Sequence, residues 1–166
     1  MSTEGDVGTH PRPLRALRIA HIVIEVSNLA ASERFYTAHL GFEVVGRMAA
    51  PAMAFLTLGI QHHDLALIER EDMRSPPKKG LHHFALQVAD LPTLRAMYAA
   101  LLAAGVPIPR AVAHIATHSF YFNDPDGHLI ELFCDVVEDG LALARSRPIR
   151  HMDEFLPIDL AAKSNA

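Results

Sequence analysis

The segment HIVIEVSNL at 21–29 decides the fold, because it returns as HFALQVADL at 83–91, 62 positions further along the chain. A second pair of similar segments follows at the same interval, with ALIE at 66–69 answered by HLIE at 128–131. An internal repeat of this kind means that one structural unit occurs twice and that each copy buries its apolar face against its neighbour. The sequence therefore predicts two modules packed about a pseudo-twofold axis.

Each copy of the repeat carries one histidine and, 48 positions later, one glutamate: His21 with Glu69, and His83 with Glu131. Packing the two modules about a twofold axis would gather these four potential metal ligands at the junction. Glu131 also stands among apolar neighbours on its predicted strand, where an unpaired carboxylate is costly and a metal or cation removes that cost. We therefore expect a metal site between the modules.

Apolar and polar residues alternate along the first half of each copy, as they do in half-buried strands. Asn28 and Asp90 are suited to cap the helices that follow. In the first copy the pattern predicts strands at 18–26, 42–48, 53–59 and 63–70 and a helix at 29–40. In the second copy it predicts strands at 81–88, 108–113, 117–122 and 128–135 and a helix at 91–104. Each module is thus β-α-β-β-β, and the fold class is α+β, with two tandem modules forming an open, metal-centred half-barrel.

The charged, Pro- and Gly-containing stretch REDMRSPPKKG at 70–80 marks a linker between the modules. Within one structural domain, the predicted parts are a flexible N-terminal segment, two modules and a C-terminal tail, at 1–16, 17–75, 76–135 and 136–166. The tail has weak periodicity and several prolines, and we expect it to wrap the core or to contact another subunit.

Composition excludes several classes of partner. The formal net charge of the 166 residues is −4 and no basic block occurs, which argues against nucleic acid. No secretory signal is recognisable, and no apolar run approaches the roughly 20 residues that span a membrane. The single cysteine, Cys134, cannot form an internal disulfide and is expected to be a buried thiol. A cytosolic, cytoplasmic protein is the simplest interpretation.

The doubled β-α-β-β-β pattern, the two strand-borne histidines and the closing YFNDPDGHLIEL at 121–132 resemble the vicinal oxygen chelate superfamily, over about residues 17–135. That superfamily includes glyoxalase I, fosfomycin-resistance thiol transferases, bleomycin-binding proteins and type I extradiol ring-cleaving dioxygenases. The segments QHHDLAL at 61–67 and HIATHSFYF at 114–122 are most similar to those of the dioxygenases. The chain would be a short member with a single pair of modules.

This resemblance implies a function and a set of site residues. The function is insertion of O2 into a catechol-type aromatic diol, with ring cleavage at a non-heme Fe(II), or with Mn(II) as the alternative metal. Two histidines and one carboxylate form the facial triad of such enzymes. The implied metal ligands are His21, His83 and Glu131, and the implied catalytic residues are His63 as acid/base, Tyr121 as hydrogen-bond donor and His114 as orienting group. The implied partners are a small aromatic diol and further copies of the chain, in a homo-oligomer.

Two other functions stay open at this point. One is a glyoxalase I-like lyase, isomerase or epimerase, in which Glu69 would be the fourth ligand of a divalent metal. The other is a metal-free drug-binding module similar to bleomycin-resistance proteins. Three of these residues could instead have purely structural roles. Tyr121 could pack on its strand, His114 could lie in a loop in contact with water, and Glu69 could belong to a solvated face.

Overall fold

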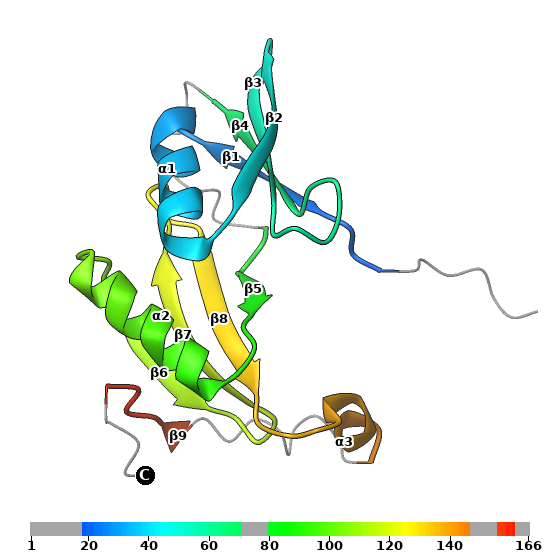
Figure 1. The fold of residues 1–166 in the computed structure, drawn as a ribbon, viewed down its shortest axis with the longest axis vertical. Coiled ribbons are helices and arrows are strands. Elements are labelled where there is room, and N and C mark those ends of the chain that lie inside the picture. The colour runs from blue at the N-terminus through cyan, green and yellow to red at the C-terminus, as the bar shows by residue number, and fades with distance from the viewer. Residues whose placement is uncertain (1–17, 71–79, 147–155, 162–166) are drawn as a thin grey trace, which may run out of the picture.

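The computed structural model describes residues 18–70, 80–146 and 156–161, and within them the β-α-β-β-β order occurs twice (Figure 1). The predicted flexible segment 1–16 and most of the predicted linker lie outside these residues. The first module consists of β1 (Ile22–Val26), α1 (Leu29–Leu40), β2 (Glu43–Ala49), β3 (Ala52–Thr57) and β4 (Leu65–Glu69). The second consists of β5 (Phe84–Gln87), α2 (Leu91–Ala103), β6 (Arg110–Ala113), β7 (Thr117–Asn123) and β8 (Leu129–Asp135). The tail adds α3 (Gly140–Ser146) and β9 (Leu156–Pro157).

Each module forms its own sheet. The strand order is β1-β4-β3-β2 in the first sheet and β5-β8-β7-β6-β9 in the second. In both, the opening strand lies at an edge and pairs in parallel with the module's last strand, whereas the other pairs are antiparallel. Helix α1 packs against the first sheet and α2 against the second, and neither sheet closes into a barrel (Figure 1). The predicted α+β fold with two modules is therefore confirmed.

The alternation that predicted the opening strands also determines which side chains they bury. Ile24 and Val26 point into the core, whereas Val23, which precedes them on the strand, is 52% exposed. The helices begin where capping side chains stand: the Asn28 side chain accepts a hydrogen bond from the backbone N–H of Ala31 at 2.9 Å, and Asp90 does the same for α2. One face of each sheet is thus committed to its helix, and the other face is available for a site.

A single apolar core runs through both modules. Its fully buried members include Tyr36, Leu56, Phe120 and Ile130. Leu160 of the tail joins this cluster, and β9 pairs with β6, so the expectation that the tail wraps the core is confirmed for these residues. Cys134 is completely buried, as predicted, and burial raises the pKa of its thiol.

The turn between β7 and β8 holds the two modules together. The carboxylate of Asp126 accepts hydrogen bonds from the backbone N–H of Ser27 at 3.0 Å and from the Ser27 and Ser32 hydroxyls at the start of α1. The buried hydroxyl of Tyr36 donates to Asp124 at 2.8 Å, and the Nδ1 atom of His128 lies 2.9 Å from the same carboxylate oxygen. This turn therefore has a structural role between the modules.

We call the contact of Tyr36, Asp124 and His128 at this turn the joint, and hydrogen bonding determines its charges. Burial alone would raise the pKa of Asp124, but hydrogen bonds from His128 and Tyr36 outweigh it and lower that pKa. The hydrogen bond to Asp124 raises the pKa of His128, and burial beside the same carboxylate raises that of Tyr36. The joint is thus a carboxylate held charged by two neutral or cationic donors.

Candidate metal centre

The second module brings three of the predicted site residues together. His83 lies just before β5, and its Nε2 atom is 3.1 Å from Oε2 of Glu131 on β8. Tyr121 on β7 pairs directly with Glu131 across the sheet, and its ring lies 5.8 Å from that of His83. The side chain of Glu131 is only 13% exposed. We call His83, Glu131 and Tyr121 the carboxylate half-site.

Tyr121 remains a hydrogen-bond donor in this environment. Burial, together with its hydrogen bond to Glu131, raises the pKa of its phenol to about 12, although the neighbouring Arg110 works in the opposite direction. The guanidinium carbon of Arg110 lies 4.1 Å from the centre of the Tyr121 ring. Arg110 was missed in the sequence because only the pairing of β6 with β7, which sets it opposite Tyr121, brings it to this face.

The first module carries two further predicted site histidines, His21 and His63. The rings of His21 and His63 lie 4.3 Å apart, and the Nδ1 atoms of His62 and His63 are separated by 2.6 Å. Phe55 packs against His63 with its ring 5.3 Å away. Burial, followed by the charges of His21 and His62, lowers the pKa of His63. We call His21, His62 and His63 the histidine half-site.

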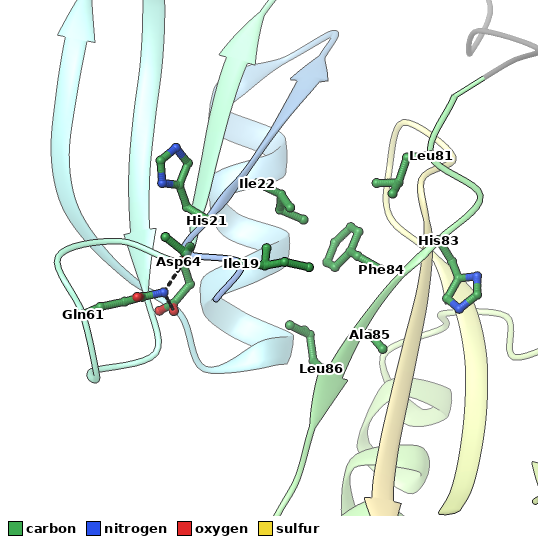
Figure 2. Close-up of a pocket in the computed structure, with 11 residues that line it drawn as sticks. Ile19, His21, Ile22, Gln61, Asp64, Leu81, His83, Phe84, Ala85 and Leu86 are labelled. Carbon is green, nitrogen blue, oxygen red and sulfur yellow. Dashed lines mark hydrogen bonds between the residues drawn. The ribbon is translucent and has the colours of Figure 1, made fainter. Parts of the chain in front are cut away.

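These two half-sites do not meet within one chain. Figure 2 shows His21 and His83 on opposite sides of a pocket of about 420 Å³, with their imidazoles directed away from each other. The side chains between them are apolar: Ile19, Ile22, Leu81, Phe84 and Leu86. Within the described ranges, no three His, Cys, Asp or Glu side chains are close enough to hold a metal ion. The ligand set His21, His83 and Glu131 thus stays a prediction that a single chain does not assemble.

Glu69 does not occupy the position of Glu131, contrary to what the 48-residue spacing predicted. Ile22 pairs with Leu65, whereas its repeat counterpart Phe84 pairs with Ile130, so the last strand of the second module is shifted by three residues. One cause is the longer connection from helix to strand in the second module, 104–109 against 41–42 in the first.

This shift gives the two glutamates different neighbours. Glu131 is paired with Ala85, whose repeat counterpart Val23 is paired with Ala66 rather than with Glu69. The Glu69 carboxylate instead accepts a hydrogen bond of 2.7 Å from the backbone N–H of Leu29, at the first turn of α1. The first module therefore contributes His21 without a matching carboxylate.

His114 lies in the turn between β6 and β7. The two strands pair Ala113 with His118 at this turn and Arg110 with Tyr121 at the other end of the hairpin. Three residues along a strand correspond to about 10 Å, so His114 and Tyr121 lie at different ends of the pairing. His114 is in electrostatic contact with His118, whose pKa is lowered by burial, by Arg95 and by His114. The predicted orienting role of His114 stays a prediction.

Two open sheets, each formed by the strands of one β-α-β-β-β module, define a paired-module fold, and one of them carries the His83, Glu131 and Tyr121 group. Residues 18–132 match the Glyoxalase/Bleomycin resistance protein/Dioxygenase superfamily, and the chain belongs to it. No helix among the described residues is long and apolar enough to cross a membrane.

Relatives within this superfamily come from several enzyme types. Biphenyl-2,3-diol 1,2-dioxygenase 3 of Rhodococcus globerulus is 36% identical to this chain. The match covers 71% of this chain and 63% of that protein's length. Glutathione transferase FosA of Serratia marcescens is 31% identical over 80% of this chain and 91% of its own length. A glyoxylase/bleomycin resistance protein/dioxygenase domain from a Frankia species shares the fold, with a TM-score of 0.63 at 20% identity over 73% of this chain and 99% of that domain.

Proposed function

We propose that the protein is an extradiol dioxygenase that cleaves an aromatic diol with O2 at a non-heme Fe(II). The observation that carries this proposal is the convergence of His83, Glu131 and the protonated phenol of Tyr121 on the free face of one sheet. The relationship to biphenyl-2,3-diol and catechol dioxygenases supports it. The chain spans less than two thirds of the length of the biphenyl-diol enzymes, so this activity is proposed for the chain rather than carried over.

The donor atoms suit the proposed metal. His83 and Glu131 already lie 3.1 Å apart and converge from two adjacent strands, so a cation between them would satisfy a largely buried carboxylate. Together with His21 they make a set of two imidazoles and one carboxylate, which suits Fe(II) with open positions for ligands. When bound, the iron would supply the chemistry that activates the diol and O2.

We infer that a second copy of the chain completes the site. The histidine half-site and the carboxylate half-site lie on opposite sides of one chain, and between them lie apolar side chains of the edge strands β1 and β5 and of the residues just before these strands. A twofold dimer makes every contact twice, so the His21 side of each chain would meet the Glu131 side of its partner. Two equivalent sites per dimer would result.

The other residues have roles that follow from their positions. Tyr121 keeps its proton and would donate a hydrogen bond to one oxygen of the diol. His63, held between His21 and Phe55, would accept the proton of the second hydroxyl and return it later to the ring-opened product. The apolar side chains around the half-sites would keep water from the aromatic ring.

The test is to load the purified protein with Fe(II) anaerobically and to measure bound iron and O2 uptake with 2,3-dihydroxybiphenyl and simple catechols. We expect a yellow ring-fission product in proportion to the O2 consumed. His63→Ala should retain iron and lose most of the turnover, whereas Glu131→Ala should lose iron. His39→Ala, which changes an α1 histidine packed against Phe35, is the matched control and should alter neither. Bound iron without cleavage of any diol would contradict the proposal.

A fosfomycin-modifying function is the second candidate, because FosA matches over nearly its whole length whereas the dioxygenases do not. The same metal-loaded protein, incubated with fosfomycin and glutathione, would then form a thiol adduct detectable by mass spectrometry without consuming O2. The glyoxalase-like alternative has lost its main support, because Glu69 caps α1 instead of facing His21.

A further inference from the structure

Arg110 is a cationic side chain that lies beside the carboxylate half-site. The register of the second sheet pairs Arg110 on β6 with Tyr121 on β7, and Tyr121 in turn with Glu131 on β8. These three side chains therefore form one row across three adjacent strands, on the face that carries His83. The guanidinium is held against the Tyr121 ring, with its carbon atom 4.1 Å from the ring centre.

None of the ion pairs found among the described residues includes this guanidinium. Arg47 and Arg70 form ion pairs with Glu33 and Glu25, whereas the exposed guanidinium of Arg110 stacks on the ring of Tyr121 and hydrogen-bonds to its phenol. Glu131 does not fill this role, because its carboxylate is turned towards His83. The half-site thus presents a positive charge whose fork of N–H donors is available to a ligand.

A guanidinium recognises carboxylates through paired, charge-assisted hydrogen bonds. We propose that the substrate is an aromatic diol bearing a carboxylate, with its two hydroxyls at the Glu131 end of the row and its carboxylate at Arg110. This inference rests on the proposed function and names the substrate class for that site. Arg110 would be the residue that separates anionic from neutral diols, because stacking on Tyr121 fixes the direction in which its donors point.

The experiment compares matched diols that differ only by a carboxylate or a methyl group. The pairs are 3,4-dihydroxybenzoate with 4-methylcatechol and 2,3-dihydroxybenzoate with 3-methylcatechol. Dissociation constants are measured by titration calorimetry on the Fe(II)-loaded protein without O2, so that binding is read independently of turnover. The variants are Arg110→Gln, Arg110→Lys and, as the control, Arg34→Gln, which changes an exposed arginine of α1.

We expect Arg110→Gln to weaken binding of a carboxylated diol by about tenfold to a hundredfold, the loss typical of a hydrogen-bonded charge. Its methyl counterpart should change by less than about threefold, which is within the range of small surface effects. The dissociation constant of the carboxylated diol for Arg110→Lys should lie between those for Arg110→Gln and wild type, because lysine keeps the positive charge and loses the paired N–H donors. Arg34→Gln should change neither member of a pair.

Two results would overturn this inference and leave the proposed function intact. One is that wild-type protein binds the methylcatechols more tightly than both carboxylated diols. The other is that Arg110→Gln weakens both members of a pair equally. If no diol of either kind binds to the iron-loaded protein, the proposed function fails and this inference fails with it. Circular dichroism of each variant establishes that the fold is unchanged.

Discussion

Mixing two inactive variants tests whether each site is shared between two chains. His21→Ala removes a group from the histidine half-site, and Glu131→Ala removes one from the carboxylate half-site. In a dimer containing one chain of each variant, one site loses both groups. The other site keeps His21 from one chain and Glu131 from its partner, and it is complete.

The size of the effect follows from random exchange of subunits. An equal mixture gives about half heterodimers, and each heterodimer has one complete site out of two, so about a quarter of the wild-type activity should return. The assay dissociates the two variants in mild urea, refolds them together with Fe(II), and measures O2 uptake with a catechol substrate. Each variant refolded alone should remain inactive.

A matched mixture provides the control. His21→Ala with His63→Ala places both changes in the same half-site, so every possible site in the mixture lacks one of the two groups. This mixture should stay inactive. If His21→Ala and Glu131→Ala also stay inactive together, although size-exclusion chromatography shows a mixed dimer, the shared-site reasoning is refuted.

Three further predictions concern the joint and Glu69. Tyr36→Phe removes the hydroxyl that donates to the buried Asp124. It should lower the free energy of unfolding by about 1.5–3 kcal/mol, measured by urea denaturation. An unchanged urea midpoint would contradict the structural role of the joint. The raised pKa of His128 means that its charged pair with Asp124 stabilises the fold fully below the ordinary histidine pKa of about 6.5 and loses this effect as pH rises through the raised value. The pKa of Asp124 is lowered, so its charged carboxylate stabilises the fold fully above the ordinary aspartate pKa. This stabilisation is lost as pH falls through the lowered pKa. The stability difference between wild type and His128→Gln should therefore be largest between about pH 4 and pH 6.5 and shrink towards pH 9, and a difference independent of pH would exclude the charged pair. Glu69→Gln should leave the bound metal unchanged in elemental analysis, because its carboxylate caps α1, and loss of metal would restore Glu69 as a ligand.

Much of the fold could be predicted from the sequence, because its signals are local. The alternation of apolar and polar residues predicted β1 and β5 to within a few residues of their observed bounds. The capping residue Asn28 correctly predicted the start of α1. The two elements of the tail were missed, since α3 has only seven residues and β9 only two, too few for a period to emerge. Their positions depend on contacts such as the pairing of β9 with β6.

The candidate site was harder to predict, because its residues meet through strand register. Spacing along the chain correctly grouped Tyr121 with Glu131, since a short turn joins their strands and constrains the pairing. The same reasoning failed for Glu69, where insertions between distant strands changed the register without altering the similar letters ALIE and HLIE. Arg110 carries no motif, and its place beside Tyr121 follows only from the pairing of β6 with β7.

The three-residue shift between the modules also changes which residues are true counterparts. His63 and His128 each stand two residues before the first strand residue paired with the module's opening strand, so they occupy equivalent positions of the two modules. In the second module this histidine contacts Asp124, the carboxylate that accepts the hydrogen bond from Tyr36 of the first module. In the first it faces His21 beside a partly exposed edge. Two histidines at equivalent positions of the modules thus have different surroundings: His128 supports the carboxylate at the contact between the modules, whereas His63 lies in the histidine half-site.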